Sequence, residues 1–88
     1  MIRRRVRVHG HVQGVFFRDA CQGEAAAAGV NGWVRNCSDG TVEAVFEGEE
    51  SAVKTLSEWC RQGPPKARVN HIDIVDEEPD GESSFEVH

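Results

Sequence analysis

The sequence predicts an α+β fold in which an antiparallel sheet is covered on one face by two helices. Two kinds of pattern support this prediction: short segments alternate polar and apolar residues, as strands do, and two longer segments carry apolar residues at helical spacing. The third observation is their order along the chain, which is strand, helix, strand, strand, helix, strand and a short terminal strand.

The first strand and the first helix lie near the N-terminus. Residues 5–9 alternate basic or polar with apolar side chains, which indicates a strand with one buried face that ends at Gly10. A loop over residues 11–16 leads into a helix predicted for residues 17–28, with Gly29 as its C-cap. The helix prediction rests on the spacing of Phe17, Cys21, Ala25 and Ala28.

A β-hairpin is predicted after the first helix. Residues 32–37 and 41–47 flank a Ser38-Asp39-Gly40 turn, and Asp-Gly between two strand-like runs is a strong hairpin signal. On one face of the second hairpin strand we expect Val42, Ala44 and Phe46.

The second helix begins near Glu49 and stops before Gly63-Pro64-Pro65, because proline cannot continue a helix. Its apolar stripe consists of Ala52, Val53, Leu56, Trp59 and Cys60.

The last segments complete the order of elements. Residues 67–75 are predicted to form a strand, and one step of three in their apolar spacing predicts a β-bulge near Asn70 or His71. Residues 76–84 read as a solvated acidic loop and residues 85–87 as a short last strand. The resulting order is that of the ferredoxin-like split β-α-β sandwich, which hosts RNA-binding modules, metallochaperones, regulatory domains and enzymes.

Length and composition narrow the class of protein. The 88 residues, with a net charge of −5, predict a single domain spanning residues 1–88. No window approaches the roughly 20 apolar residues of a membrane span, and the basic start lacks the apolar stretch of a secretory signal, so we expect a cytoplasmic monomer without a membrane partner. The negative net charge argues against nucleic acid as a partner.

Three cysteines without CxxC spacing suggest neither a disulfide framework nor a zinc site.

The charges are unevenly distributed along the chain. Residues 1–18 contain five arginines and no acid, whereas residues 73–88 contain seven acids and no lysine or arginine. An anion site on the basic first strand and loop is therefore compatible with the acidic total, because the acidic segment lies at the other end of the chain.

The segment from Val8 to Arg18 carries the first candidate site. A strand runs into a glycine-containing loop that opens a helix, where successive backbone N–H groups can form an anion-binding nest. Gly14 supplies the dihedral freedom that such a loop needs, and Arg18 adds a planar, charged fork suited to two phosphate oxygens. The alternative is an ordinary strand-to-helix connection with Arg18 solvated on the surface.

Asn36 ends the first hairpin strand and, taken alone, is typical of a turn. Together with the first segment, however, it belongs to a sequence that resembles the acylphosphatase family. Residues 8–18 match the pattern aliphatic-x-Gly-x-Val-Gln-Gly-Val-x-Phe-Arg, and residues 32–48 match Gly-aromatic-Val-basic-Asn-x3-Gly-x-Val-x5-Gly. Residues 63–67 and 85–87 also resemble later landmarks of the family.

The resemblance implies metal-independent hydrolysis of the carboxyl-phosphate bond of a small-molecule acyl phosphate, with no cofactor, by direct in-line attack of water. Acetyl phosphate, carbamoyl phosphate and 1,3-bisphosphoglycerate all present this bond. Arg18 and Asn36 are the implied catalytic residues, Arg18 as a phosphoryl ligand and Asn36 as the residue that orients the water. The residues implied to bind the phosphoryl group are Gln13, Gly14, Val15, Phe16, Phe17 and Arg18.

This chemistry agrees with what the sequence lacks. No Ser-His-Asp or Cys-His arrangement can be assigned, and the histidines are scattered without the spacing of a metal site, so no metal is expected. We expect them to be structural or exposed, although His11 lies in the loop, where it could tune the electrostatics. The four histidines are His9, His11, His71 and His88.

Two alternatives remain from other classes. A ferredoxin-like RNA-binding module would stack bases on aromatic residues of its central strands, but the first strand has none and Phe46 belongs to the face of Val42 and Ala44. A non-catalytic module that binds an acyl phosphate or carbamoyl phosphate, as part of larger machinery, would share the fold and the phosphate loop.

Overall fold

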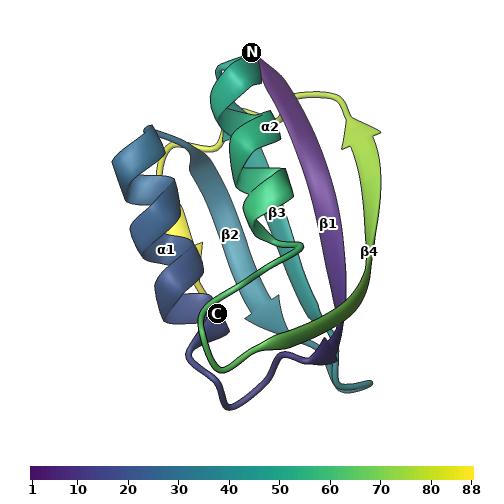
Figure 1. The fold of residues 1–88 in the computed structure, drawn as a ribbon. Coiled ribbons are helices and arrows are strands. Elements are labelled where there is room, and N and C mark those ends of the chain that lie inside the picture. Colours follow the sequence, from purple (N-terminus) through teal and green to yellow (C-terminus); the bar gives the residue numbers. More distant parts are fainter.

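The computed structural model describes all 88 residues as one sheet with two helices packed on a single face (Figure 1). The sheet order is β4-β1-β3-β2-β5, so the first strand lies near the middle and β4 and β5 form the edges. This is the predicted ferredoxin-like α+β fold. The elements are β1 (Ile2–His11), α1 (Phe17–Ala28), β2 (Asn31–Asn36), β3 (Val42–Gly48), α2 (Glu50–Trp59), β4 (Arg68–Glu77) and β5 (Phe85–Val87).

The helices follow the predicted boundaries closely. α1 spans residues 17–28 as predicted, and Gly29 caps it in the left-handed conformation with φ of 69°. α2 begins after Glu49, whose carboxylate accepts a hydrogen bond from the Ser51 N–H, which satisfies one free donor of the first turn. Neither helix has the length and apolar character that crossing a membrane requires.

Two features of the strands differ from the predictions. β1 runs over residues 2–11 and not 5–9. Its backbone pairs with β3 on one side and β4 on the other, and this pairing continues beyond the residues that alternate polar and apolar. The sheet is also not wholly antiparallel, since β5 pairs parallel to β2, with Val34 opposite Val87. Alternation within a short strand carries no information about its direction, so this could not be inferred from the sequence.

The predicted bulge lies in β4. His9 of β1 is opposite His71, but the next residue, Gly10, is opposite Val69, which leaves Asn70 as the extra residue. The backbones approach closely here: a Cβ on Gly10 would lie 2.1 Å from the Arg68 carbonyl oxygen, so only glycine fits.

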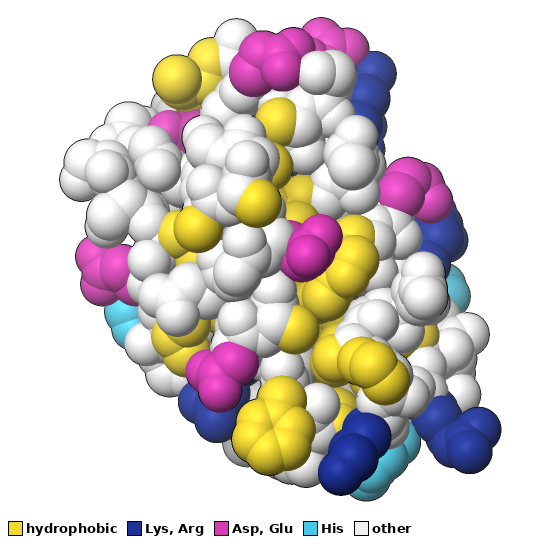
Figure 2. Space-filling view, turned by 60° about the vertical axis from the view of Figure 1, so that its left-hand side comes forward, with side chains coloured by type: hydrophobic (Ala, Val, Ile, Leu, Met, Phe, Trp, Pro, Cys, Tyr) yellow, Lys and Arg dark blue, Asp and Glu magenta, His cyan; other side chains and the backbone are white.

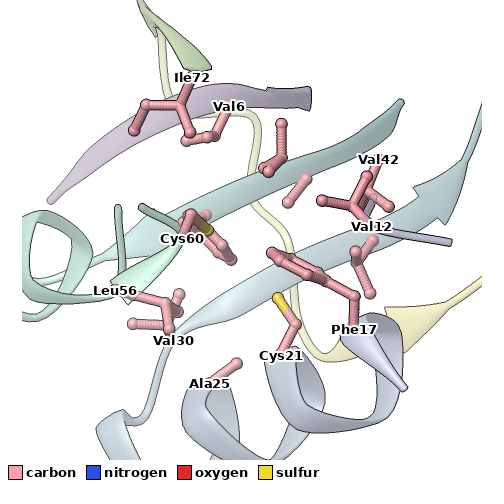
Figure 3. Packing of buried hydrophobic residues seen from close by; sticks show 14 of the residues in the cluster. Val6, Val12, Phe17, Cys21, Ala25, Val30, Val42, Leu56, Cys60 and Ile72 are labelled. Atoms are coloured by element: carbon pink, nitrogen blue, oxygen red, sulfur yellow. The ribbon is translucent and has the colours of Figure 1, made fainter. Parts of the chain in front are cut away.

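The hydrophobic core fills the space between the sheet and the helices (Figure 3). Burial of each large apolar side chain contributes about 1.5–3 kcal/mol, and packing between layers is the main stabilising contribution. The three cysteines are free, and burial raises the pKa of Cys60 to about 12. The core contains nine residues from the apolar faces predicted for the two helices and β3: Phe17, Cys21, Ala25, Val42, Ala44, Phe46, Val53, Leu56 and Cys60.

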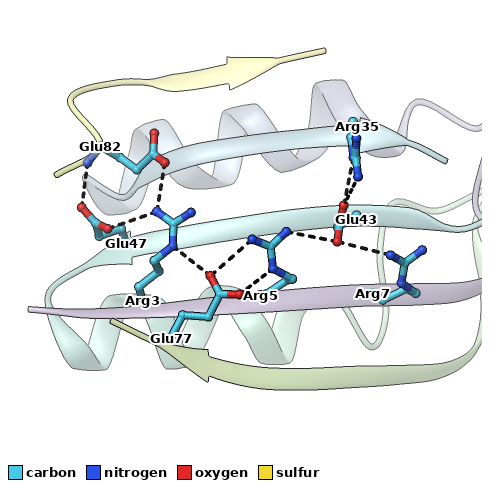
Figure 4. Close-up of polar contacts among 8 residues, drawn as sticks. All are labelled: Arg3, Arg5, Arg7, Arg35, Glu43, Glu47, Glu77 and Glu82. Carbon is cyan, nitrogen blue, oxygen red and sulfur yellow. Dashed lines mark hydrogen bonds and ion pairs between the residues drawn. The ribbon is translucent and has the colours of Figure 1, made fainter. Parts of the chain in front are cut away.

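The face of the sheet opposite the helices is covered by a network of ion pairs (Figure 4). Glu43, on β3, accepts hydrogen bonds from Arg5, Arg7 and Arg35. Arg3 donates to Glu47, Glu77 and Glu82. Most of the basic charge of the first strand is therefore neutralised on this face.

The network corrects the interpretation of residues 76–84 as a solvated loop. Asp76 and Glu77 belong to β4, and Glu77 pairs with both Arg3 and Arg5. Glu82 also binds Arg3, at 2.9 Å. The acidic segment thus folds back onto the basic strand, a contact between the two ends of the chain that their separation in sequence conceals.

Glu47 is the most buried acid of this network, with 2% of its surface exposed. Its carboxylate accepts hydrogen bonds from the backbone N–H groups of Asp80, Gly81 and Glu82 in addition to Arg3. Burial alone would raise its pKa, but these donors outweigh burial and hold the pKa below the ordinary value. The charged form of Glu47 therefore anchors the segment that leads to β5.

Replacing Glu47 by glutamine should test this anchor through the pH dependence of stability. Because the folded pKa is lowered, the charge stabilises the fold above the ordinary glutamate pKa of 4.5, and this contribution is lost as the pH falls through the folded value. We expect E47Q to lower the free energy of unfolding by roughly 1–3 kcal/mol near neutral pH. The difference from wild type should shrink below about pH 4.5.

Urea denaturation at several pH values measures this difference. Glu78→Gln is the matched control, because Glu78 is exposed and forms no ion pair. If the free energy of unfolding of E47Q stayed below that of wild type by the same amount across the acidic range, the loss would come from altered packing or hydrogen bonding and not from the missing charge.

Candidate active site

A pocket of about 270 Å³ opens where β1 passes into α1. Figure 1 places this connection at the lower end of the molecule, and Figure 2 shows hydrophobic and basic side chains exposed together at that end. The structure thus brings Arg18, Asn36 and the loop to one place, although residues 18 and 36 are far apart in sequence. The pocket is lined by Val12, Gly14, Phe16, Phe17, Arg18, Asp19 and Asn36.

The loop backbone has an unusual shape. Gly14 has φ of 73°, and Phe16, with φ of 65° and ψ of 26°, is the one residue other than glycine with positive φ. A left-handed conformation costs a residue with a side chain about 1–2 kcal/mol, so tertiary contacts must hold Phe16 there. The backbone N–H groups of residues 13–16 donate no hydrogen bond within the protein, which leaves them available to a ligand.

The side chains on either side of Phe16 explain how the loop is held. Val15 and Phe17 are buried in the core, with 5% and 2% of their surfaces exposed, whereas 69% of Phe16 is exposed. The Phe17 ring packs against Trp59, with ring centroids 5.3 Å apart. Since the side chains of Val15 and Phe17 face the core, any contact of these two residues with a ligand must come from their backbones.

Gln13 joins the loop to the hairpin that carries Asn36. Its side-chain amide donates to the Cys37 carbonyl at 2.7 Å and to the Thr41 carbonyl at 2.9 Å. The amide group of Gln13 is therefore a positioning element, and the residue can offer a ligand only its backbone N–H.

Arg18 lies in the first turn of α1 and lines the pocket. Its Nη1 donates to the backbone oxygen of His88 at 2.8 Å, which restrains the guanidinium without neutralising it by an aspartate or glutamate side chain. The remaining donors of the planar guanidinium are free to bind an anion. Asp19 and Val12 also line the pocket, and neither was predicted to bind the ligand; Val12 is a position of the first motif, whereas Asp19 lies outside it.

Asn36 is the last residue of β2 and lies opposite Val42 of β3. It is exposed at the pocket, and its side-chain amide forms no hydrogen bond within the protein. A primary amide can both donate and accept, so Asn36 can hold a water molecule or a ligand oxygen.

The histidines are exposed or half-buried, in line with the expectation, and two of them share a neighbour that the sequence did not indicate. His11, on the strand end before the loop, is exposed and does not line the pocket. The histidines have no metal-site spacing in the sequence, but the register of β1 and β4 brings His9, His71 and Asp73 together. Residues 9 and 71 are distant in sequence, and only the strand pairing reveals their contact.

Comparison with known proteins agrees with this geometry. The acylphosphatase family model matches residues 4–87. An acylphosphatase from Rubrobacter xylanophilus is 58% identical over 85 residues, covering 94% of this chain and 76% of that protein. The crystal structure of an acylphosphatase from Bacillus subtilis superposes with a TM-score of 0.96 at 36% identity, over 100% of this chain and 99% of that one.

The loop between β1 and α1, the strand-end asparagine and the extent of these matches lead to one conclusion: the chain belongs to the acylphosphatase family. The same fold also occurs inside a longer protein. A structure of full-length HypF in its phosphate- and nucleotide-bound form matches 99% of this chain, but only 12% of its own length, at 26% identity and a TM-score of 0.91.

Replacing Gln13 by leucine should loosen the contact between loop and hairpin. The change removes two hydrogen bonds and leaves the Cys37 carbonyl without its Gln13 donor, which should cost about 1–2 kcal/mol. Amide hydrogen exchange should then accelerate in residues 37–41, whose backbone Gln13 holds. Gln22→Leu is the matched control, because Gln22 is exposed on α1. Unchanged exchange in residues 37–41 of Q13L would contradict the positioning role.

Proposed function

We propose that the chain is an acylphosphatase that hydrolyses the carboxyl-phosphate bond of small acyl phosphates to a carboxylate and inorganic phosphate. The observation that carries this proposal is the pocket that joins unpaired loop N–H groups, the guanidinium of Arg18 and the free amide of Asn36. The relatives that match over most of their length bear the same activity in their names.

The loop and Arg18 bind the phosphoryl group. The backbone N–H groups of residues 13–17 and the guanidinium donate to its oxygens, and the N-terminus of α1 adds a favourable dipole. Phosphoryl transfer passes through a loose transition state with charge on the equatorial oxygens. A preorganised set of donors therefore stabilises the transition state directly.

Asn36 orients the attacking water. The water oxygen forms a bond to phosphorus in line with the leaving oxygen, and the bond between phosphorus and the carboxylate oxygen breaks. The proton of the water passes to an oxygen of the substrate's own phosphate group. The products are a carboxylate and inorganic phosphate, so atoms and charge balance.

The leaving group makes a strong general acid unnecessary. A carboxylate is a weak base and departs without protonation, so the protein needs to supply only positioning and positive potential. The reaction as proposed uses no metal and no cofactor. All pocket residues come from one chain, so a monomer with one domain over residues 1–88 would suffice for the reaction, and we propose a cytoplasmic location for it.

The distribution of charge fits an anionic substrate. Arg3, Arg5 and Arg7 of β1 pair with acids on the sheet face away from the helices, whereas Arg18 of α1 has no aspartate or glutamate partner and donates to the His88 backbone oxygen. A guanidinium without an aspartate or glutamate partner, together with free amides, can hold a phosphoryl dianion in a protein of net charge −5.

Phosphate release from benzoyl phosphate in the presence of a chelator tests the function. Tag-free, folded protein should hydrolyse benzoyl phosphate and acetyl phosphate at undiminished rates after metal removal. A phosphate monoester such as phenyl phosphate should be hydrolysed far more slowly, because its leaving group is a stronger base. Folded protein that binds phosphate but releases none from acyl phosphates would identify a non-catalytic binding module instead.

Two substitutions separate binding from water attack. Arg18→Ala should lower kcat/KM by about 10³-fold or more and weaken competitive inhibition by phosphate, because the guanidinium binds the phosphoryl oxygens. Asn36→Ala should lower kcat by about 10²–10³-fold and leave phosphate inhibition unchanged.

Controls for these variants are Arg68→Ala and Asn70→Ala, which change exposed residues that do not line the pocket. An Asn36→Ala enzyme with the wild-type rate would refute the water-orienting role. Equal loss of phosphate affinity in the Arg18 and Asn36 variants would show that both residues bind the phosphoryl group.

A further inference from the structure

A second cluster of functional side chains lies on the sheet face away from the helices. His9 and His71 are directly opposite each other on β1 and β4, with ring centroids 5.3 Å apart. Asp73 follows two residues after His71 in the same strand, so its side chain is on the same face. The pair lies next to the bulge at Asn70.

The three side chains already converge on one point. Asp73 Oδ2 lies 2.9 Å from His9 Nε2, and Asp73 Oδ1 lies 2.7 Å from His71 Nε2. An ionised carboxylate can only accept hydrogen bonds, so both imidazoles donate from Nε2. The potential ligand atoms of the three residues all lie within 4.8 Å of one another, a separation that one metal ion can bridge.

Asp73 has His9 and His71 as its only ion-pair partners. Arg7 is opposite Asp73 in the strand register, but its guanidinium binds Glu43 and Thr41 and approaches Asp39. Asp73 therefore has no arginine partner, unlike Glu43 or Glu77 in the neighbouring network. Its negative charge is available to a cation.

We propose that His9, His71 and Asp73 form a binding site for one divalent transition-metal ion of the zinc type. Two imidazole nitrogens and one carboxylate oxygen are ligands that Zn²⁺ prefers, and three protein ligands leave a coordination position for water. To bind the ion, each neutral imidazole carries its single hydrogen on Nδ1 and presents the lone pair of Nε2, in place of the Nε2 hydrogen that it donates to Asp73 without the ion. His9 and His71 are held by a paired backbone, so little ordering is needed.

The proposed site is separate from the pocket described above. None of its three residues lines that pocket, and all three project from the face that bears the ion-pair network. The proposal therefore stands or falls independently of acyl phosphate hydrolysis, and binding, not activity, provides its readout.

Calorimetric titration of Zn²⁺ into metal-stripped, tag-free protein tests the site. We expect one saturable Zn²⁺ per chain. Since loss of an outer hydrogen-bond partner alone commonly weakens metal affinity 10–100-fold, loss of a ligand in His71→Ala or Asp73→Asn should weaken it by at least about tenfold. The controls are His11→Ala, an exposed histidine of the same strand, and Cys37→Ser, which removes the one thiol that is not buried.

Imidazole nitrogen NMR spectra locate the ion directly. Added Zn²⁺ should shift the Nε2 resonances of His9 and His71 and leave those of His11 and His88 in place. Absence of saturable binding below about 1 mM, or wild-type affinity in either H71A or D73N, would overturn the proposal. So would binding that is lost in C37S, because the ion would then be held by the thiol.

Discussion

The backbone of the loop over residues 12–16 can offer its N–H groups to an anion because the core holds the side chains around it. Val15 and Phe17 are buried, and they fix Phe16 between them in a left-handed conformation that it would not adopt alone. The core thus supplies the energy that keeps the loop in this shape. Arg18 follows within the first turn of α1, so the same anchoring places the guanidinium beside the amides.

The paired arginines of β1 and the arginine of the pocket lie in different parts of the molecule. On the face away from the helices, arginines of β1 are neutralised by acids from β3, β4 and the segment before β5 (Figure 4). At the end of the sheet, Arg18 has no aspartate or glutamate partner and lines the pocket. This separation explains how an acidic protein presents a site for a dianion, and why net charge is a poor guide to its ligand.

Local patterns predicted most of the fold and most of the site. The apolar spacing gave both helices, and the phase slip located the bulge at Asn70, because these features depend on neighbouring residues. The parallel pairing of β5, the contact of Glu82 with Arg3 and the cluster of His9 with His71 depend on strands that are distant in sequence. The motifs identified Arg18 and Asn36, but the internal anchoring role of the Gln13 amide appeared only in three dimensions.

The central claim is that backbone amides of the loop bind the phosphoryl group. Titration of inorganic phosphate into ¹⁵N-labelled protein, followed by NMR, measures this most directly. The account predicts that the amide resonances of Gly14, Val15 and Phe16 shift together and saturate with one dissociation constant, which matches the constant for competitive inhibition, while Asn70 is unaffected. Loop amides that stay unchanged when phosphate fully inhibits the enzyme would contradict it.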